Sequence, residues 1–355
     1  MDPLPARAEV AIVGGGVAGL ATAWALAARG VGDVVVLERE AAVASQASGR
    51  NAAMCRALAE DDAWTEVTAE GAAFLRAPPP GFARRPLVDG RGAVLLAGEA
   101  AVDVLRARAL RFALRHEVVT AADVAARWPG LEVARGGLWF PDDGVIDLGV
   151  LVESYAVAAR AGGVRIVTGA EVMAVVPDDG RGGGGGGVVV HTPHGALDAR
   201  QLVVAAGAWS DEVAARAHVA GVGLVSRRRH IVALHANAAD APIVWDVDGD
   251  EWYVRPAGPE VWASACDSDV VGAGVVDART SAEAEVRERL PRSLARAPLA
   301  RVWACQRTFA AGAPLVARDV ASPWLVRVVG LGGHGVTASA AIGRAAAAVV
   351  SSQVR

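Results

Sequence analysis

The chain has 355 residues, a net charge of −4, and a composition of 53% hydrophobic and 21% charged residues. This length predicts two domains or one domain with a large insertion, and the composition is that of an ordered globular protein. The charge disfavours a nucleic-acid or anionic-membrane partner. The sequence contains no lysine, so all 35 basic residues are arginine, which excludes Schiff-base catalysis and a Walker P-loop.

The three cysteines, Cys55, Cys266 and Cys305, lie far apart and form no CxxC pair. This spacing argues against structural zinc, an iron–sulfur centre and a disulfide framework, and favours a reduced, cytoplasmic setting. The apolar stretch 10–28 is interrupted by glycines. We therefore interpret it as a buried strand followed by a helix, and expect no integral membrane segment.

The first elements predict a nucleotide-binding unit. An apolar strand over residues 9–13 meets three consecutive glycines at 14–16, and a helix is expected over residues 18–28. A second apolar strand at 34–37 ends on Glu38. Strand, tight turn, helix and strand together form a βαβ unit.

From residue 76 the pattern becomes irregular, with a short strand at 92–96 and a helix near 102–114, and here we expect a second domain to begin. A helix at 148–161 and a strand at 164–167 resemble a further step of a wound sheet, so the nucleotide-binding domain resumes there. The glycine run at 182–187 predicts a mobile hairpin tip without a function of its own.

The second half of the chain contains the remaining strands. After a strand at 202–205, alternating runs at 227–234, 252–255 and 261–265 predict an antiparallel sheet that forms the floor of a substrate site. A strand at 325–329, a glycine turn and a helix at 338–350 close the chain.

The expected fold class is α/β, with a Rossmann-like domain and an inserted, mainly antiparallel β-sheet substrate domain. The discontinuous nucleotide-binding domain is expected over residues 1–75, 145–225 and 320–355, and the substrate domain over 76–144 and 226–319.

The spacing of Gly14, Gly16 and Gly19 is the GxGxxG pattern. The first glycine permits the turn, the second lets the backbone approach a pyrophosphate, and the third allows close packing of helix and strand. Glu38, at the end of the next strand, is placed to accept hydrogen bonds from ribose hydroxyls. A carboxylate there disfavours a 2′-phosphate, so the pattern predicts FAD or NAD rather than NADP.

Two further glycine turns, at 206–208 and 332–335, favour FAD, because a permanently bound flavin needs backbone around its ring. The last turn precedes a helix whose positive end can stabilise negative charge on a reduced flavin.

Together with the segment 48–53 and the runs 205–209 and 306–309, these motifs resemble the D-amino-acid oxidase, glycine oxidase and sarcosine oxidase superfamily over nearly the whole chain. The nearest resemblance is to the bacterial D-arginine dehydrogenase type. It implies non-covalent FAD, because no histidine lies in the 48–53 segment and Cys305 does not match the family's attachment position. The implied cofactor-binding residues are Gly14, Gly16, Val17, Ala18, Gly19, Glu38, Arg39, Ser48, Arg50, Asn51, Ala52, Ala53, Val172, Ala206, Gly207, Trp209, Gly332, Gly333, Gly335, Val336 and Thr337.

The resemblance also implies a clamp for the substrate carboxylate, formed by Arg307, Tyr253 and Arg229. The guanidinium fork matches a planar carboxylate. Arg229 adjoins Arg227 and Arg228, so a solvated run of charge is the alternative interpretation. His334, in the last glycine turn, is expected to contact flavin or substrate.

The implied activity is oxidation of the C–N bond of an amino acid, with a D-amino acid favoured, to an imine and then a 2-oxo acid by hydride transfer to flavin N5. The alternatives are a sarcosine- or glycine-type secondary amine, a 2-hydroxy acid, or a flavoprotein subunit that needs a partner for catalysis. The electron acceptor, oxygen or a quinone, stays open. The absence of a lysine near N5 favours a dehydrogenase over an oxidase.

The sequence also departs from the D-arginine pattern. Ala93 stands where that type has a glutamate for the guanidinium, and its pocket histidine, threonine and tyrosine fall near Met54, Arg56 and Ala59. Nothing replaces the glutamate directly, although Asp89 and Glu60 are nearby in sequence. A substrate with an apolar or differently charged side chain is therefore expected. No metal site is expected, because His191 and His194 lie in a β-like segment without a third ligand.

Overall fold

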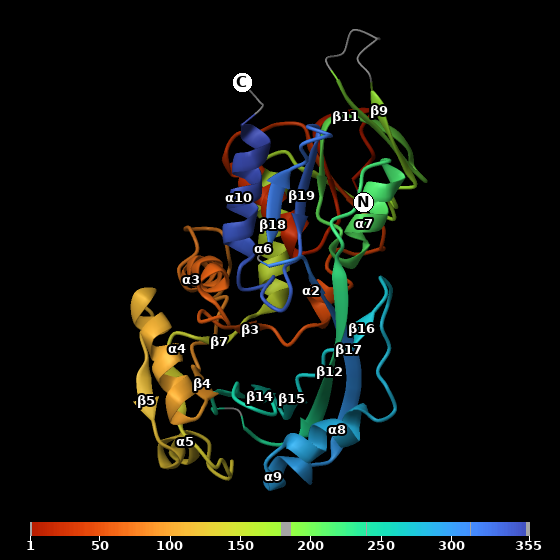
Figure 1. Cartoon of the computed structure of the whole chain (residues 1–355). Coiled ribbons are helices and arrows are strands. Elements are labelled where there is room, and N and C mark those ends of the chain that lie inside the picture. Colours follow the sequence, from red (N-terminus) through yellow and green to blue (C-terminus); the bar gives the residue numbers. More distant parts are fainter. Residues whose placement is uncertain (1, 179–185, 239, 313, 353–355) are drawn as a thin grey trace.

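The computed structural model describes residues 2–178, 186–238, 240–312 and 314–352. It contains two large β-sheets, one above the other in Figure 1, with helices on their outer faces. The sequence-based fold class is confirmed: a Rossmann-like sheet is combined with a second, mainly antiparallel sheet.

The first sheet has a parallel centre. Its strands run in the order β18-β19-β11-β1-β2-β8, and the pairs β19/β11, β11/β1, β1/β2 and β2/β8 are parallel. These strands are β1 (Arg7–Val13), β2 (Val34–Glu38), β8 (Arg165–Thr168), β11 (Gly195–Val204), β18 (Leu315–Arg318) and β19 (Leu325–Val329). All five residues of β2 and of β19 are buried, as expected for strands covered on both faces.

An antiparallel extension leaves this sheet at β11. It consists of β10 (Gly187–Thr192) and β9 (Ala174–Asp178), and the helix α7 (Ser210–Arg216) packs beside it. The predicted glycine hairpin tip falls mainly on residues 179–185, outside the described residues.

Three helices cover the opposite face of the first sheet: α1 (Val17–Ala28), α6 (Leu148–Ala161) and α10 (Ser339–Ser351). The stretch 10–28 is thus β1 and α1, as predicted. Among the described residues, no helix is both long and apolar enough to cross a membrane. A cluster of Trp24, Phe74, Phe82 and Tyr155 fills the space beneath these helices, and the Tyr155 hydroxyl lies 2.9 Å from Ser339 Oγ.

The second sheet has the strand order β16-β12-β15-β14-β13-β4-β6-β5, with β17 paired to β12. Every pair is antiparallel except β4/β13. The strands are β4 (Ala93–Leu96), β5 (Glu117–Val119), β6 (Gly137–Phe140), β12 (Val225–His235), β13 (Ile243–Asp246), β14 (Trp252–Ala257), β15 (Glu260–Ser264), β16 (Val270–Val271) and β17 (Leu299–Phe309).

The helices of this part are α4 (Glu99–Arg111), α5 (Ala121–Arg127), α8 (Ala282–Arg289) and α9 (Arg292–Ala295). The expected helix at 102–114 is α4, which begins after Gly98 and ends before Ala113, whose φ is +52°.

The chain crosses between the sheets through α2 (Ala47–Arg50), the short pair β3 (Met54–Cys55) and β7 (Gly144–Val145), and α3 (Asp62–Arg76). The domain boundaries themselves stay a prediction. One strand, β18, lies inside the expected substrate segment 226–319 but pairs with β19 in the first sheet.

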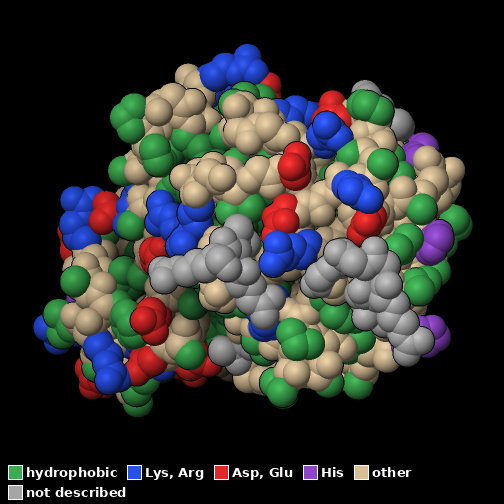
Figure 2. Space-filling view, turned by 90° about the horizontal axis from the view of Figure 1, so that it is seen from above, with side chains coloured by type: hydrophobic (Ala, Val, Ile, Leu, Met, Phe, Trp, Pro, Cys, Tyr) green, Lys and Arg blue, Asp and Glu red, His purple; other side chains and the backbone are tan. Residues whose placement is uncertain are grey.

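Seen from above, the face formed by the described residues has arginine and acidic side chains interspersed rather than gathered by sign (Figure 2). Charged side chains of the described residues are often paired, as in the contacts of Arg216 with Glu171 and of Arg344 with Glu70.

Candidate active site

A cavity of about 500 Å³ lies between the two sheets. The loops that follow β1, β2, β11 and β19 line one side of it, and residues of β12, β14 and β17 line the other. A crevice outside the carboxyl ends of parallel strands is where α/β folds bind dinucleotides.

The glycine loop has the geometry that its sequence predicts. Gly14 has φ +110°, and a Cβ there would lie 2.5 Å from the Ala205 carbonyl oxygen. A Cβ on Gly19 would lie 1.9 Å from the Gly14 oxygen, so only glycine lets α1 pack this closely against the loop. Gly16 lines the cavity and immediately precedes α1.

Val17 and Ala18, the first residues of α1, also line the cavity. The Val17 N–H donates to Ser48 Oγ at 3.0 Å. The N–H groups of Gly16 and Ala18 donate to no other described residue, and are free to bind the phosphate oxygens of a dinucleotide.

Glu38 organises the adjacent turn. Its Oε2 accepts from the Gly15 N–H at 2.7 Å and its Oε1 from the Glu40 N–H at 2.9 Å, which leaves one lone pair on each oxygen for ribose hydroxyls. Arg39 stacks on Trp209, with its guanidinium carbon 3.8 Å from the ring centroid. These side chains and Val172 all line this end of the cavity.

The segment that carries Ser48, Asn51, Ala52 and Ala53 lines the middle of the cavity. Asn51 Oδ1 accepts from the Ala53 N–H at 2.7 Å and holds Ala53 at φ +51°. Arg50 differs from its neighbours: its carbonyl accepts from Trp303 Nε1 at 2.8 Å, and the residue itself does not line the cavity.

The glycine turn after β19 forms the wall near the second sheet. Gly332 has φ +52°, and a Cβ there would lie 2.7 Å from the Phe309 ring. Thr337 Oγ1 donates to the Met54 carbonyl at 3.1 Å, which ties this turn to β3. The other predicted residues of the glycine turns also line the cavity: Ala206, Gly207, Gly333, Gly335 and Val336.

The predicted carboxylate clamp lies together on the floor of the cavity. Arg229 on β12 pairs with Cys305 on β17, two residues before Arg307, so both arginines project from the same face of the sheet. Tyr253 on β14 is 2% exposed and lines the same cavity. Arg229 is buried, and the alternative of a solvated charge run is excluded for it.

The two arginines have no carboxylate partner among the described residues. Arg229 Nε donates to the Asp267 carbonyl at 3.0 Å, and Arg307 Nη2 donates to the same carbonyl at 3.2 Å. Burial and the charge of Arg229 lower the pKa of Arg307 to about 10, so it remains cationic at neutral pH. Burial raises the pKa of Tyr253, and its hydroxyl therefore keeps its proton and can donate.

The opposite wall contains a cluster of interacting side chains, Arg56, Glu60 and His334, whose contacts were not predicted from the sequence. Glu60 accepts from Arg56 Nη2 at 2.5 Å and lies 2.6 Å from His334 Nε2. Arg56 stacks on Trp245 with 4.1 Å between the guanidinium carbon and the ring centroid, and His334 packs against Trp64. Burial alone would raise the pKa of Glu60, but the charge of Arg56 and the bond from His334 lower it well below its usual value.

Other positions singled out by the sequence lie away from the cavity. Ala93 is buried in β4, and Asp89 is engaged by Arg91 and by the Val145 N–H. Neither lines the cavity. Trp245 was missed altogether: Asp248 and Gly249 signal a turn after it, but its position opposite Tyr253 results from the five-residue connection between β13 and β14.

A Rossmann-like sheet whose glycine loop opens onto a cavity floored by a second sheet is the architecture of a dinucleotide-dependent oxidoreductase. The family model described as FAD dependent oxidoreductase (DAO) matches residues 9–349. The chain therefore belongs to this family of flavoproteins. It is an FAD-dependent enzyme. The glycine loop and the N–H groups of Gly16 and Ala18 fit the pyrophosphate of FAD, and Glu38 fits its ribose.

Individual relatives are more distant. The chain is 26% identical over 227 residues to mouse mitochondrial sarcosine dehydrogenase, covering 61% of this chain and 24% of that protein. Glycine oxidase from Geobacillus kaustophilus has a TM-score of 0.84 at 22% identity, covering 98% of this chain and 95% of that one. L-proline dehydrogenase from P. horikoshii has a TM-score of 0.87 at 19% identity, covering 98% and 94%. The chain spans about a third or less of the length of the curated relatives that it matches.

Proposed function

We propose that this flavoenzyme oxidises the C–N bond of an amino acid, with a D-amino acid as the favoured substrate, to an imine that water hydrolyses to a 2-oxo acid. The observation that carries the proposal is the pair Arg229 and Arg307, side by side on the cavity floor, with no carboxylate of the described residues within bonding distance. Two cations that face the cavity without a carboxylate partner favour an anionic ligand, and a substrate carboxylate matches their geometry.

In this proposal the arginines bind the substrate carboxylate and Tyr253 donates a further hydrogen bond to it. Arg307 Nη1 and both Nη atoms of Arg229 donate to no described residue and are therefore available. Anchoring the carboxylate fixes the orientation of the Cα–H and the amine, which enters unprotonated, so no strong protein base is required. Bound FAD supplies the acceptor for the hydride.

The wall opposite the clamp supports a substrate whose side chain is not cationic. Both oxygens of Glu60 are already engaged, one by Arg56 and the other by His334. Glu60 is thus already paired within the protein, while Asp61 and Glu251 are further carboxylates that line the cavity. An uncharged side chain is proposed because the glutamate of the D-arginine dehydrogenase type has no direct counterpart at Ala93, which does not line the cavity.

A secondary amine is the second candidate. The mouse relative is a sarcosine dehydrogenase, and another relative, from Paenarthrobacter nicotinovorans, is a 4-methylaminobutanoate oxidase. Such substrates present the same carboxylate to the clamp and differ at the nitrogen. A 2-hydroxy acid substrate and a requirement for a partner subunit are the remaining alternatives. The anaerobic mixing experiment described below tests both, and it also tests the electron acceptor.

A reduced, cytoplasmic setting is part of the proposal. It is supported by the three cysteines, all of which are free thiols, with Cys55 and Cys305 buried.

The first experiment is anaerobic mixing of the purified protein with D- and L-amino acids, sarcosine and 2-hydroxy acids, followed by the bleaching of flavin absorbance. Bleaching by one class identifies the substrate, and admission of air then distinguishes an oxidase from a dehydrogenase. A flavin that none of these compounds reduces would contradict the proposal for the isolated chain.

The clamp predicts that Arg307→Leu keeps bound FAD but loses about 1,000-fold in kcat/KM, because removing a buried partner of a carboxylate costs roughly 3–5 kcal/mol. The control is Arg301→Leu, on the same strand but with its side chain 57% exposed, which should retain activity. Normal turnover by the Arg307 variant would refute the clamp.

A further inference from the structure

The loop after β15 is built around Asp267, and its backbone carbonyl is the one group that both clamp arginines share. Arg229 Nε and Arg307 Nη2 donate to this oxygen at 3.0 and 3.2 Å. Two like charges on neighbouring strands repel each other, and a common acceptor holds them side by side. The position of this carbonyl therefore directs both guanidinium groups, and for Arg307 it acts together with Ser268 Oγ, to which Nη2 donates at 3.3 Å.

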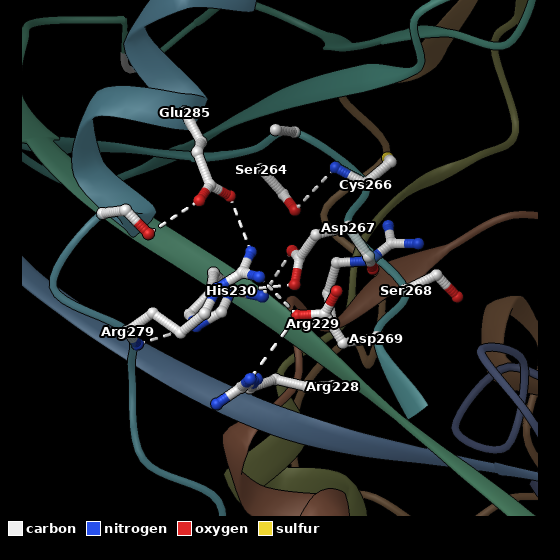
Figure 3. Close-up of polar contacts among 12 residues, drawn as sticks. Arg228, Arg229, His230, Ser264, Cys266, Asp267, Ser268, Asp269, Arg279 and Glu285 are labelled. Carbon is white, nitrogen blue, oxygen red and sulfur yellow. Dashed lines mark hydrogen bonds and ion pairs between the residues drawn. The ribbon is translucent and has the colours of Figure 1, made fainter. Parts of the chain in front are cut away.

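The carboxylate of the same residue is fixed by His230. Asp267 Oδ1 accepts from the His230 N–H at 2.8 Å, and Oδ2 lies 2.8 Å from His230 Nδ1 (Figure 3). His230 Nε2 accepts from the Arg279 N–H at 3.0 Å, so Nδ1 carries the ring proton and donates it to the carboxylate. The His230 ring is 1% exposed and is held at both nitrogens.

The backbone on either side of Asp267 is held as well. Cys266 has φ +53°, a left-handed conformation that is uncommon for this residue type, and its N–H donates to Ser264 Oγ at 3.1 Å. On the far side, Arg279 Nη1 lies 2.5 Å from Asp269 Oδ2, and Nη2 donates to Glu285 on α8 at 2.6 Å. The loop is therefore fixed to β12, β15 and α8 at once.

We propose that Asp267 and His230 are positioning residues that aim Arg229 and Arg307 at the substrate carboxylate. This inference rests on the proposed function, in which these arginines form the clamp. The pair does not touch the reacting atoms. It acts on affinity for the carboxylate.

The test uses the FAD-loaded full-length chain with Asp267→Ala and Asp267→Asn. Affinity is measured by calorimetry with benzoate, a carboxylate that has no amine to oxidise, and KM and kcat with the best substrate of the panel. Asp267→Ala removes both bonds to His230 and is expected to raise the benzoate Kd and the substrate KM together by about 10-fold, with kcat changed less than about twofold.

Asp267→Asn keeps the shape of the side chain, but one of its two contacts with His230 becomes a donor facing a donor. We expect the benzoate Kd and the substrate KM to rise by about threefold in this variant. If Asp267 only filled space, this substitution would change neither quantity. This variant also provides the measurement if the alanine variant fails to fold.

The control is Glu283→Ala, on the neighbouring helix α8. Its carboxylate pairs with Arg287 on the same helix and makes no contact with the clamp or with the loop around Asp267. Affinity for benzoate should stay within about twofold of the wild type. Equal losses in the Glu283 and Asp267 variants would overturn the proposal, because any change in this region would then weaken binding.

The two hypotheses fail in different ways. If wild-type protein binds benzoate, Arg307→Leu abolishes that binding and both Asp267 variants bind normally, the positioning role is overturned and the clamp stands. If wild-type protein binds no carboxylate at all, the proposed function fails together with the positioning role.

Discussion

At the scale of single residues, the site is defined by which charges are paired and which are left free. Glu60 is occupied by Arg56 and His334, although its side chain is 62% exposed, whereas Arg229 and Arg307 keep unused donors. The cationic floor therefore faces a wall on which the charges of Arg56 and Glu60 compensate each other. This arrangement fits a substrate with a carboxylate at one end and an uncharged side chain at the other.

Replacing Glu60 should change side-chain preference. In Glu60→Gln the buried Arg56 loses its carboxylate, so the wall gains a positive charge that favours acidic side chains. We expect the ratio of kcat/KM for D-glutamate to that for D-leucine to rise roughly 3- to 10-fold. The expected change is no larger because solvent screens the charges at this partly exposed wall.

The control for that change is Glu66→Gln, an exposed glutamate on α3 that does not line the cavity. An unchanged ratio in the Glu60 variant, measured beside this control, would show that the wall does not contact the substrate side chain.

At the scale of elements, the close approach of α1 to the β1 loop determines where a cofactor phosphate can lie. The contact depends on Gly19, since a Cβ there would overlap the Gly14 carbonyl oxygen. The same close packing recurs between α1 and α10, where a Cβ on Gly343 would lie 2.5 Å from the Ala21 carbonyl. Small residues thus let the helices and the glycine loop form one rigid unit.

Gly19→Val should therefore lose FAD. The added side chain must displace backbone, at a cost of roughly 3 kcal/mol or more, and the displaced loop no longer presents its N–H groups. The ratio of flavin absorbance to protein absorbance after purification measures the loss. Gly32→Ala, in the same βαβ unit and with no atom within 4 Å of the added Cβ, should retain FAD. Full occupancy in Gly19→Val would contradict the phosphate-loop assignment.

At the scale of the whole molecule, the cavity owes its form to the way the chain crosses between the two sheets. Asp143 lies at this crossing, 1% exposed, with one oxygen accepting from the Ala57 N–H and the other without a partner among the described residues. Burial raises the pKa of Asp143 to about 7, although the Ala57 N–H and the charge of Arg76 oppose the shift. The folded protein therefore holds a proton there that the unfolded chain loses near pH 4.

This shift makes stability depend on pH. Because the folded-state pKa lies above the unfolded value, the stabilisation by the bound proton is complete below about pH 4 and is lost as pH rises through about 7. Asp143→Asn should remove this loss, so its free energy of unfolding relative to wild type should rise between pH 5 and pH 8, by at most roughly 2.7 kcal/mol.

Denaturant unfolding of FAD-loaded protein at the two pH values measures the difference. Asp142→Asn serves as the control, because the Asp142 carboxylate adjoins Asp143 in sequence but is partly exposed and pairs with Arg115. A stability difference for Asp143→Asn that is the same at pH 5 and pH 8 would refute the assignment.

The sequence by itself determined the βαβ unit and the cofactor, but it did not predict the helix α3 or the helix α8. The strand at 9–13, the glycines at 14–19, the helix that follows them and Glu38 are close in sequence, so local periodicity and spacing were sufficient to predict the βαβ unit and its dinucleotide. The antiparallel character of the second sheet also followed from strands with alternating burial, such as β15. Arg307, Tyr253 and Arg229 were expected only through family resemblance.

The tertiary structure alone decided how those residues act. The register of β12 against β17 brings Arg229 beside Arg307, and the crossing segment brings Arg56 and Glu60 to His334, which lies near the other end of the chain. The hydrogen bonds from His230 to Asp267 depend in turn on the loop after β15. Periodicity specifies which face of an element is buried, but charge pairing depends on which distant elements become neighbours and how deeply they are buried, and only the assembled sheets fix both.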